Sequence, residues 1–183
     1  MLELYKTPHY GLGTVVEVKI DYDKRIVTRQ FKPDAITVNG APTTKTPEEI
    51  EKFWYNEVYW LERFGNRQYI VPLLDIDYKN RIVTQAYTGP TLLDIKKDMH
   101  NKYPHLVDLI LEMYKMFKDI GVYKRNGSLS NIACDGEYIA AFDFKWCEYR
   151  PHGEEMEHRS YDEWLSKISP VLPQKLRELN DIV

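Results

Sequence analysis

Asn131 and Asp143 are the two side chains whose types and spacing best suit metal and phosphate chemistry. Asn131 ends a polar loop, and the short apolar run 132–134 follows it. A turn signal at 135–136 leads into a second apolar run, 138–142, which delivers Asp143. Amide and carboxylate oxygens are hard ligands that suit Mg²⁺ alongside substrate phosphates. The sequence therefore predicts a Mg-nucleotide site at the end of a strand-turn-strand unit.

A glycine-containing segment near the N-terminus is the second place with residues suited to phosphate binding. Gly11 and Gly13 lie in GLGTVVEV, and Val18 ends that run. Glycine lets a backbone lie close over a phosphate because it has no Cβ. Lys32 ends the alternating strand pair that follows, where a lysine can reach phosphates as a point charge. These residues predict a phosphate-binding loop beside a strand.

The segment TPEEIEKFWYNEVYWLERFG carries the signals of an amphipathic helix. Thr46 is the expected N-cap, with Pro47 at the first helical position and Glu49 completing a capping box. Apolar residues recur at helical spacing, and Gly65 follows the last of them. The sequence therefore predicts one long helix, and Glu57 lies on it.

The rest of the chain shows a change from strand signals to helix signals. Two strands are predicted around a turn at Lys79 and Asn80, before a break at Gly89 and Pro90. Residues 105–121 then repeat apolar side chains at helical spacing and end in glycine. The boundary between the two halves is therefore expected near this Gly-Pro break.

Taken in order, these motifs resemble those of the protein-kinase-like family over residues 10–143. That family has a His-Arg-Asp loop that ends in Asn five positions after the Asp, and an Asp-Phe-Gly triplet after a β-hairpin. Here the loop reads KRNGSLSN and the triplet reads DFK. The resemblance implies that Asn131 and Asp143 bind metal and that Arg125 matches the loop arginine. Asn126 stands at the position of the catalytic Asp.

The resemblance implies an α+β, two-lobed protein-kinase-like fold in a single domain of residues 1–183. The N-lobe, about residues 1–88, would hold an antiparallel sheet with one main helix. The C-lobe, about residues 89–183, would be reduced and mostly helical, because only 40 residues follow Asp143.

The resemblance also implies a site for ATP with Mg²⁺. Lys32 would contact the phosphates and form an ion pair with Glu57, for which Glu49 and Glu51 are competing partners. Thr84 would gate the back of the adenine pocket. The expected cofactor-binding residues are Gly11, Gly13, Val18, Lys32, Glu57, Gln85 and Tyr87.

Phosphoryl transfer from ATP to a protein or small-molecule hydroxyl is expected to be weak or absent. The residues at the expected catalytic positions are Asn126, Arg125 and Lys32. The amide of Asn126 cannot accept a proton as a carboxylate can, and loss of a general base costs about 10² to 10⁴ in rate. Lys124, Ser128 and Lys145 also depart from the family's pattern.

Two alternatives to a weak kinase stay open. One is a pseudokinase, a non-catalytic regulatory module that binds a protein partner. The other is transfer of the nucleotidyl group. Single residues have structural alternatives too: Asp143 can be a turn former, Asn126 can begin an Asn-Gly turn, and Lys32 can be a solvated charge. Asp162 either holds the catalytic loop or simply begins a helix.

Composition predicts a compact protein of the cytoplasm. The chain has 183 residues, 43% of them hydrophobic, and a net charge of −3. This balance offers no basic surface for nucleic acid or anionic membrane. No apolar run reaches the roughly 20 residues that a membrane helix needs. Cys134 and Cys147 lack metal-ligand spacing and are predicted to be reduced core or boundary thiols.

Overall fold

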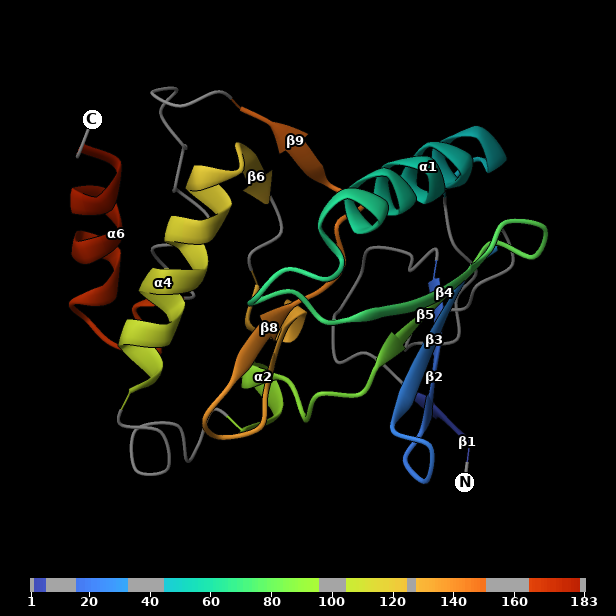
Figure 1. Ribbon diagram of the computed structural model, residues 1–183, viewed down its shortest axis with the longest axis horizontal. Coiled ribbons are helices and arrows are strands. Elements are labelled where there is room, and N and C mark those ends of the chain that lie inside the picture. The colour runs from blue at the N-terminus through green and yellow to red at the C-terminus, as the bar shows by residue number, and fades with distance from the viewer. Residues whose placement is uncertain are drawn as a thin grey trace. The chain divides into compact units, whose positions relative to one another are not determined.

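The computed structural model describes residues 2–5, 16–32, 45–95, 105–124, 128–150 and 165–181 (Figure 1). The chain divides into two units, and each is described by itself. Unit 1 consists of Met1–Asn66 and Val71–Tyr87, and unit 2 of Arg67–Ile70 and Thr88–Val183. The division after Tyr87 falls beside the Gly-Pro break.

Unit 1 is built on one antiparallel sheet. Its strands are β1 (Leu2–Tyr5), β2 (Val16–Asp21), β3 (Ile26–Phe31), β4 (Leu73–Asp77) and β5 (Ile82–Ala86). Their order in the sheet is β1-β2-β3-β5-β4, and every neighbouring pair is antiparallel. The prediction of an α+β protein with an antiparallel sheet is therefore confirmed.

The long helix α1 (Pro47–Phe64) of unit 1 begins and ends where the sequence predicts. At its start, Thr46 Oγ1 accepts from the Glu49 amide at 3.2 Å, and Glu49 Oε2 accepts from the Thr46 amide at 2.9 Å. At its end, the Gly65 amide donates to Leu61 O at 2.7 Å. A Cβ on Gly65 would lie 2.5 Å from that same oxygen, so the tight helix end requires glycine.

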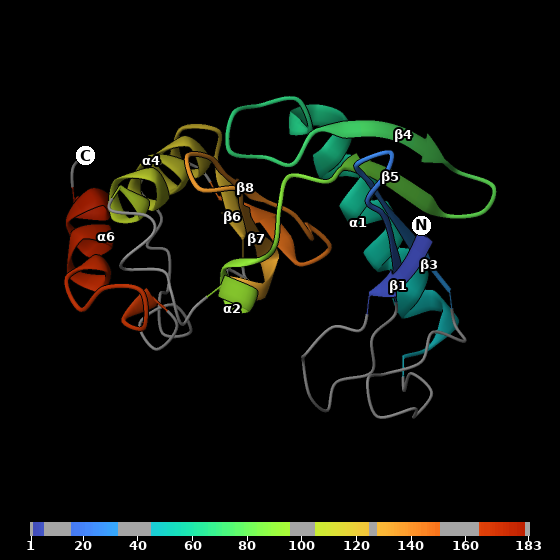
Figure 2. The ribbon, with the colours of Figure 1, turned by 90° about the horizontal axis from the view of Figure 1, so that it is seen from below.

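Helix α1 packs across one face of the sheet (Figure 2). The apolar positions predicted for its inner side are all buried: Ile50, Phe53, Trp54, Val58 and Leu61. The ring of Trp54 meets that of Phe31 edge-on, with centroids 5.5 Å apart. The same side of the helix also buries Glu57.

In its described residues, unit 2 combines short strand pairs with helices. The helices are α2 (Leu92–Ile95), α4 (Leu106–Asp119) and α6 (Leu172–Asp181), and the strands pair as β6 (Val122–Lys124) with β9 (Cys147–Tyr149) and β7 (Ile132–Cys134) with β8 (Ile139–Ala141). Both strand pairs are antiparallel.

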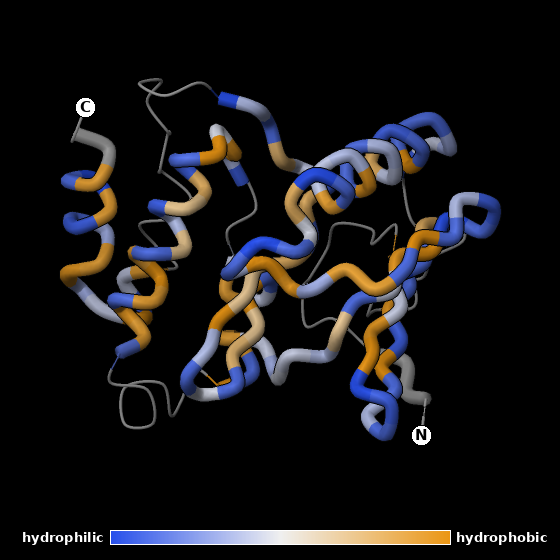
Figure 3. The backbone as a smooth tube through the Cα atoms, in the orientation of Figure 1, coloured by the Kyte–Doolittle hydropathy of each residue, from blue (hydrophilic) through white to orange (hydrophobic). Residues whose placement is uncertain are grey.

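Helix α4 is the centre of this unit, and Figure 3 shows hydrophobic and hydrophilic residues alternating along it. Its apolar side buries Leu106, Ile110, Met113 and Phe117. Lys118 Nζ donates to the carbonyl of Leu179 at 2.8 Å, which ties α6 to α4.

Both cysteines are buried free thiols, as predicted, and burial raises the pKa of Cys134. Within the described ranges, no helix has the length and apolar character needed to cross a membrane.

Candidate functional site

The β7–β8 hairpin brings Asn131 and Asp143 to the same end of one strand pair. In the hairpin register Ile132 lies opposite Ala141, and the Phe142 amide donates to Asn131 O at 3.1 Å. Asn131 is the last residue of the short 3-10 helix η1 (Leu129–Asn131). Its backbone N–H donates to Ser128 O at 2.8 Å. The strand-turn-strand unit predicted from the sequence is therefore present, with Asn131 before it and Asp143 after it.

The backbone at Asp143 has an unusual conformation, and its carbonyl accepts a hydrogen bond from a buried lysine. Asp143 has φ of 65°, in the left-handed region that few residues other than glycine adopt. Lys124, only 2% exposed, donates from Nζ to the Asp143 carbonyl at 2.7 Å. The same ammonium lies 5.2 Å from the centre of the Phe144 ring. Such backbone conformations cluster at functional sites because the surroundings must stabilise them.

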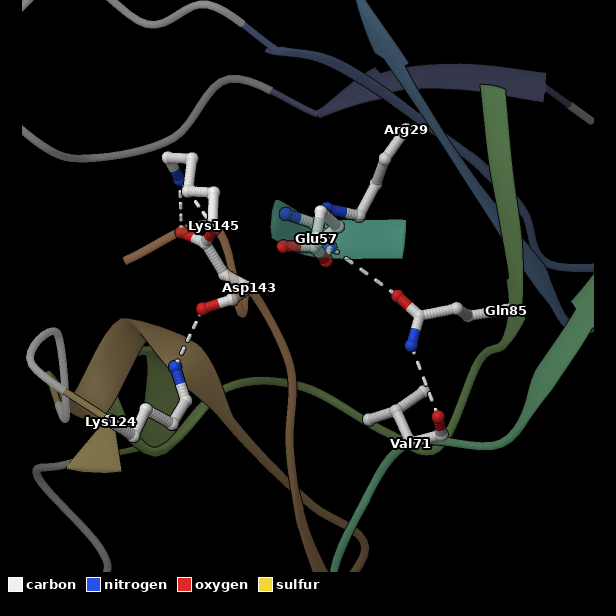
Figure 4. A network of polar contacts seen from close by, with 7 residues as sticks. All are labelled: Arg29, Glu57, Val71, Gln85, Lys124, Asp143 and Lys145. Carbon is white, nitrogen blue, oxygen red and sulfur yellow. Dashed lines mark hydrogen bonds and ion pairs between the residues drawn. The ribbon is translucent and has the colours of Figure 1, made fainter. Parts of the chain in front are cut away.

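The carboxylate of Asp143 is paired with a second lysine. Lys145 Nζ donates to both Oδ1 and Oδ2 of Asp143 (Figure 4). The chain turns sharply here, because the Cys147 amide donates to Phe144 O at 2.9 Å. The side chains of Lys145 and Asp143 are only 16% and 13% exposed, so water screens their attraction weakly. We call Lys124, Asp143 and Lys145 the Asp143 network.

The Asp143 network does not fit a magnesium site as it stands. Mg²⁺ in nucleotide sites takes one or two carboxylates together with phosphate oxygens. Both carboxylate oxygens of Asp143 already accept from an ammonium, which a metal would have to displace. Among the described residues, no group of three or more His, Cys, Asp or Glu side chains could hold a metal ion. Metal binding by Asn131 and Asp143 stays a prediction.

In unit 1 the predicted Lys32–Glu57 pair is wrong. Glu57 Oε1 accepts instead from Arg29 Nη1, and Lys32 Nζ lies 2.6 Å from Glu17 Oε2. The reason is the alternation of side chains along a strand. Arg29 and Phe31 share the buried face of β3, whereas Lys32 falls on the same face as Gln30, which lies opposite Glu17.

The Arg29–Glu57 pair is the most buried ion pair among those described. Arg29 is 4% exposed and Glu57 is fully buried. Among the described residues, Glu57 Oε2 has no hydrogen-bond partner. A buried ion pair is costly to desolvate, and a buried oxygen without a partner calls for an explanation in terms of function or strain.

Gln85 extends this cluster on the buried side of β5, and the gating role expected of Thr84 stays a prediction. Gln85 Oε1 lies 3.5 Å from Arg29 Nη1, and Gln85 Nε2 donates to Val71 O at 3.0 Å (Figure 4). Because side chains alternate along β5, Gln85 lies on the buried side with Val83, and Thr84 lies on the opposite side. We call Arg29, Glu57, Gln85 and Val71 the Arg29 network.

The remaining predicted residues fall into two groups. Val18 lies on β2 directly opposite Arg29, and Tyr87 follows β5, where its amide donates to Arg25 O at 2.8 Å. The others lie outside the described residues: Gly11, Gly13, Arg125, Asn126 and Asp162.

Three functional candidates were missed from the sequence: Arg29, Lys124 and Lys145. Arg29 alternates with Phe31 in β3, and that spacing was the available signal for a shared face. Lys124 and Lys145 were noticed only as departures from the family's pattern. Nothing in the spacing of charges indicated that two lysines would converge on Asp143.

Neither the scan against protein-family models nor the search of curated proteins found a match to this chain.

Proposed function

We propose that this protein is a kinase-like nucleotide-binding protein whose phosphoryl transfer is weak or absent. The buried Arg29–Glu57 ion pair carries the proposal. In protein kinases a lysine on the third strand pairs with a Glu on the helix that follows it, and this pair must be in place for phosphoryl transfer. Here an arginine would take the role that the sequence assigned to Lys32.

The burial of the pair favours a role in binding over a role in stability. Apolar residues of similar size can replace a buried ion pair at little cost or with a gain in stability. A buried pair whose carboxylate oxygen Glu57 Oε2 has no partner among the described residues therefore supports a ligand-binding role. Arg29 carries a planar guanidinium, a group that suits bidentate contact with a carboxylate or a phosphate.

The order of elements after Arg29 also supports a kinase-like protein. β3, α1, β4 and β5 follow one another in unit 1. In unit 2, helix α4 precedes the β7–β8 hairpin, and Asp143 comes two residues after β8. The left-handed backbone at Asp143, held by Lys124, is the kind of strained position found at active sites.

The alternative function is that of a regulatory module that binds nucleotide and a protein partner without catalysis. Asn126 favours it, because an amide at the position of the catalytic base cannot accept the substrate proton. The ammonium of Lys145 on the Asp143 carboxylate favours it too, since this carboxylate would otherwise bind the catalytic metal.

A radiolabelled ATP assay separates these functions. Wild type and Asn126→Asp are compared with a protein acceptor, and Asp143→Asn serves as the blank. A weak kinase predicts a gain of about 10²-fold or more when the carboxylate is restored. No transfer by either form, together with nucleotide-dependent thermal stabilisation, supports the regulatory module. If neither transfer nor stabilisation by millimolar ATP or ADP occurs, the proposed function is wrong.

A further inference from the structure

Two lysines place positive charge at Asp143, one from the turn that follows it and one from β6. Lys145 Nζ contacts both carboxylate oxygens, and Lys124 Nζ contacts the carbonyl oxygen of the same residue at 2.7 Å. The Lys145 ammonium occupies the position beside the two carboxylate oxygens that another cation would need in order to bind them. Like charges at such short range repel strongly where water is scarce.

The contact is built into the turn that follows Asp143. The left-handed backbone of Asp143 and the Cys147–Phe144 hydrogen bond fold the chain back within three residues. This turn delivers Lys145 to the carboxylate two positions before it. Both side chains are less than one fifth exposed, so the pair is protected from screening by salt.

We propose that the Lys145 ammonium occupies the cation position of Asp143 in place of a divalent metal, so that this protein binds nucleotide phosphates without Mg²⁺. The part about nucleotide rests on the proposed function, whereas the part about the cation position does not. An ammonium at the carboxylate neutralises its charge and presents N–H donors, which a phosphate accepts.

The direct test uses Mn²⁺ alone with the full chain and no nucleotide. Paramagnetic broadening of the amide signals of Asp143 and its neighbours reports even weak binding of the ion. Wild type is expected to show no selective broadening there. Lys145→Gln is expected to show it at an Mn²⁺ concentration at least about tenfold lower than any that affects wild type. Lys145→Gln combined with Asp143→Asn is expected to lose it again.

Two further variants make the result decisive. Lys175→Gln, at an exposed position of α6, removes the same charge elsewhere and is expected to behave as wild type. If Lys145→Gln fails to fold, Lys145→Met keeps the apolar stem and removes only the ammonium. Selective broadening in wild type equal to that of the Lys145 variants overturns the proposal. A folded Lys145 variant without broadening also overturns it, because Asp143 would then not be a cation position.

Nucleotide binding is tested separately. The affinity of wild type for ADP is expected to be the same in excess EDTA and in excess Mg²⁺. A loss of affinity in EDTA would overturn the proposal that nucleotide binds without a metal. If ADP does not bind under either condition, the proposed function fails, while the Mn²⁺ experiment still decides whether Lys145 occupies the cation position.

Discussion

Arg29 on β3 and Glu57 on α1 form a buried ion pair that joins the sheet of unit 1 to its helix. The guanidinium also lies within 3.5 Å of Gln85 Oε1, whose side-chain amide bonds to the carbonyl of Val71. One charged pair therefore links a strand, a helix and a second strand.

The first prediction concerns the stability of this pair. Arg29→Met leaves the Glu57 carboxylate buried without a counter-charge, so it is expected to lower the free energy of unfolding by about 3–5 kcal/mol. Arg29→Met combined with Glu57→Gln is expected to cost much less, because no unpaired charge remains. Denaturant unfolding measures both. Equal losses in the single and double variants would contradict a coupled pair.

The second prediction concerns Lys32 and the pH dependence of its partner. The hydrogen bond from Lys32, followed by that from Lys19, lowers the pKa of Glu17 from its ordinary value of 4.5. The stabilisation from this lowered pKa is present above pH 4.5 and is lost as the pH falls through the folded-state pKa. Lys32→Met is expected to raise the pKa of Glu17 toward 4.5, as measured by NMR titration of its side-chain carboxyl.

Glu57 is the internal control for the Lys32 substitution. The Lys32 substitution is expected to leave the chemical shift of the Glu57 carboxyl unchanged, since Glu57 pairs with Arg29. A change in the chemical shift of Glu57 instead of Glu17 would mean that Lys32 pairs with Glu57, as expected from the sequence.

The third prediction concerns the left-handed backbone of Asp143. Asp143→Ala and Asp143→Gly both remove the ion pair with Lys145, so they differ mainly in how well they accept φ of 65°. A residue with a Cβ pays about 1–2 kcal/mol in this region, and glycine does not. The Gly variant is therefore expected to be more stable than the Ala variant by about that amount. Equal stability in thermal and denaturant unfolding would mean that this backbone conformation is not retained.

Local signals in the sequence predicted helix α1 well, because its caps depend on residues close in sequence. Thr46, Glu49 and Gly65 satisfy backbone groups of their own helix, so no knowledge of the rest of the protein is needed. The strand-turn-strand unit before Asp143 was predictable for the same reason: a two-strand hairpin depends on apolar runs and a turn.

The ion pairs were not predictable in this way. Which cation reaches Glu57 depends on which face of β3 the helix covers, and that is decided by packing between distant segments. The resemblance to kinases pointed to a lysine at a strand end and so to Lys32, and it did not point to Arg29 on the buried face of β3. The contact of Lys145 with Asp143 depends on a left-handed backbone that an aspartate seldom adopts.

The most direct measurement of the central claim is a calorimetric titration of ADP into wild type, into the double variant Arg29→Met with Glu57→Gln, and into Lys32→Met. The double variant removes the charged pair without leaving a buried charge, and Lys32→Met is the matched control because Lys32 pairs with Glu17. The proposed function predicts that wild type and Lys32→Met bind ADP with similar affinity and that the folded double variant loses at least about tenfold, as expected when a charged contact to phosphate is removed. Unchanged affinity in the double variant, or a loss confined to Lys32→Met, would contradict it.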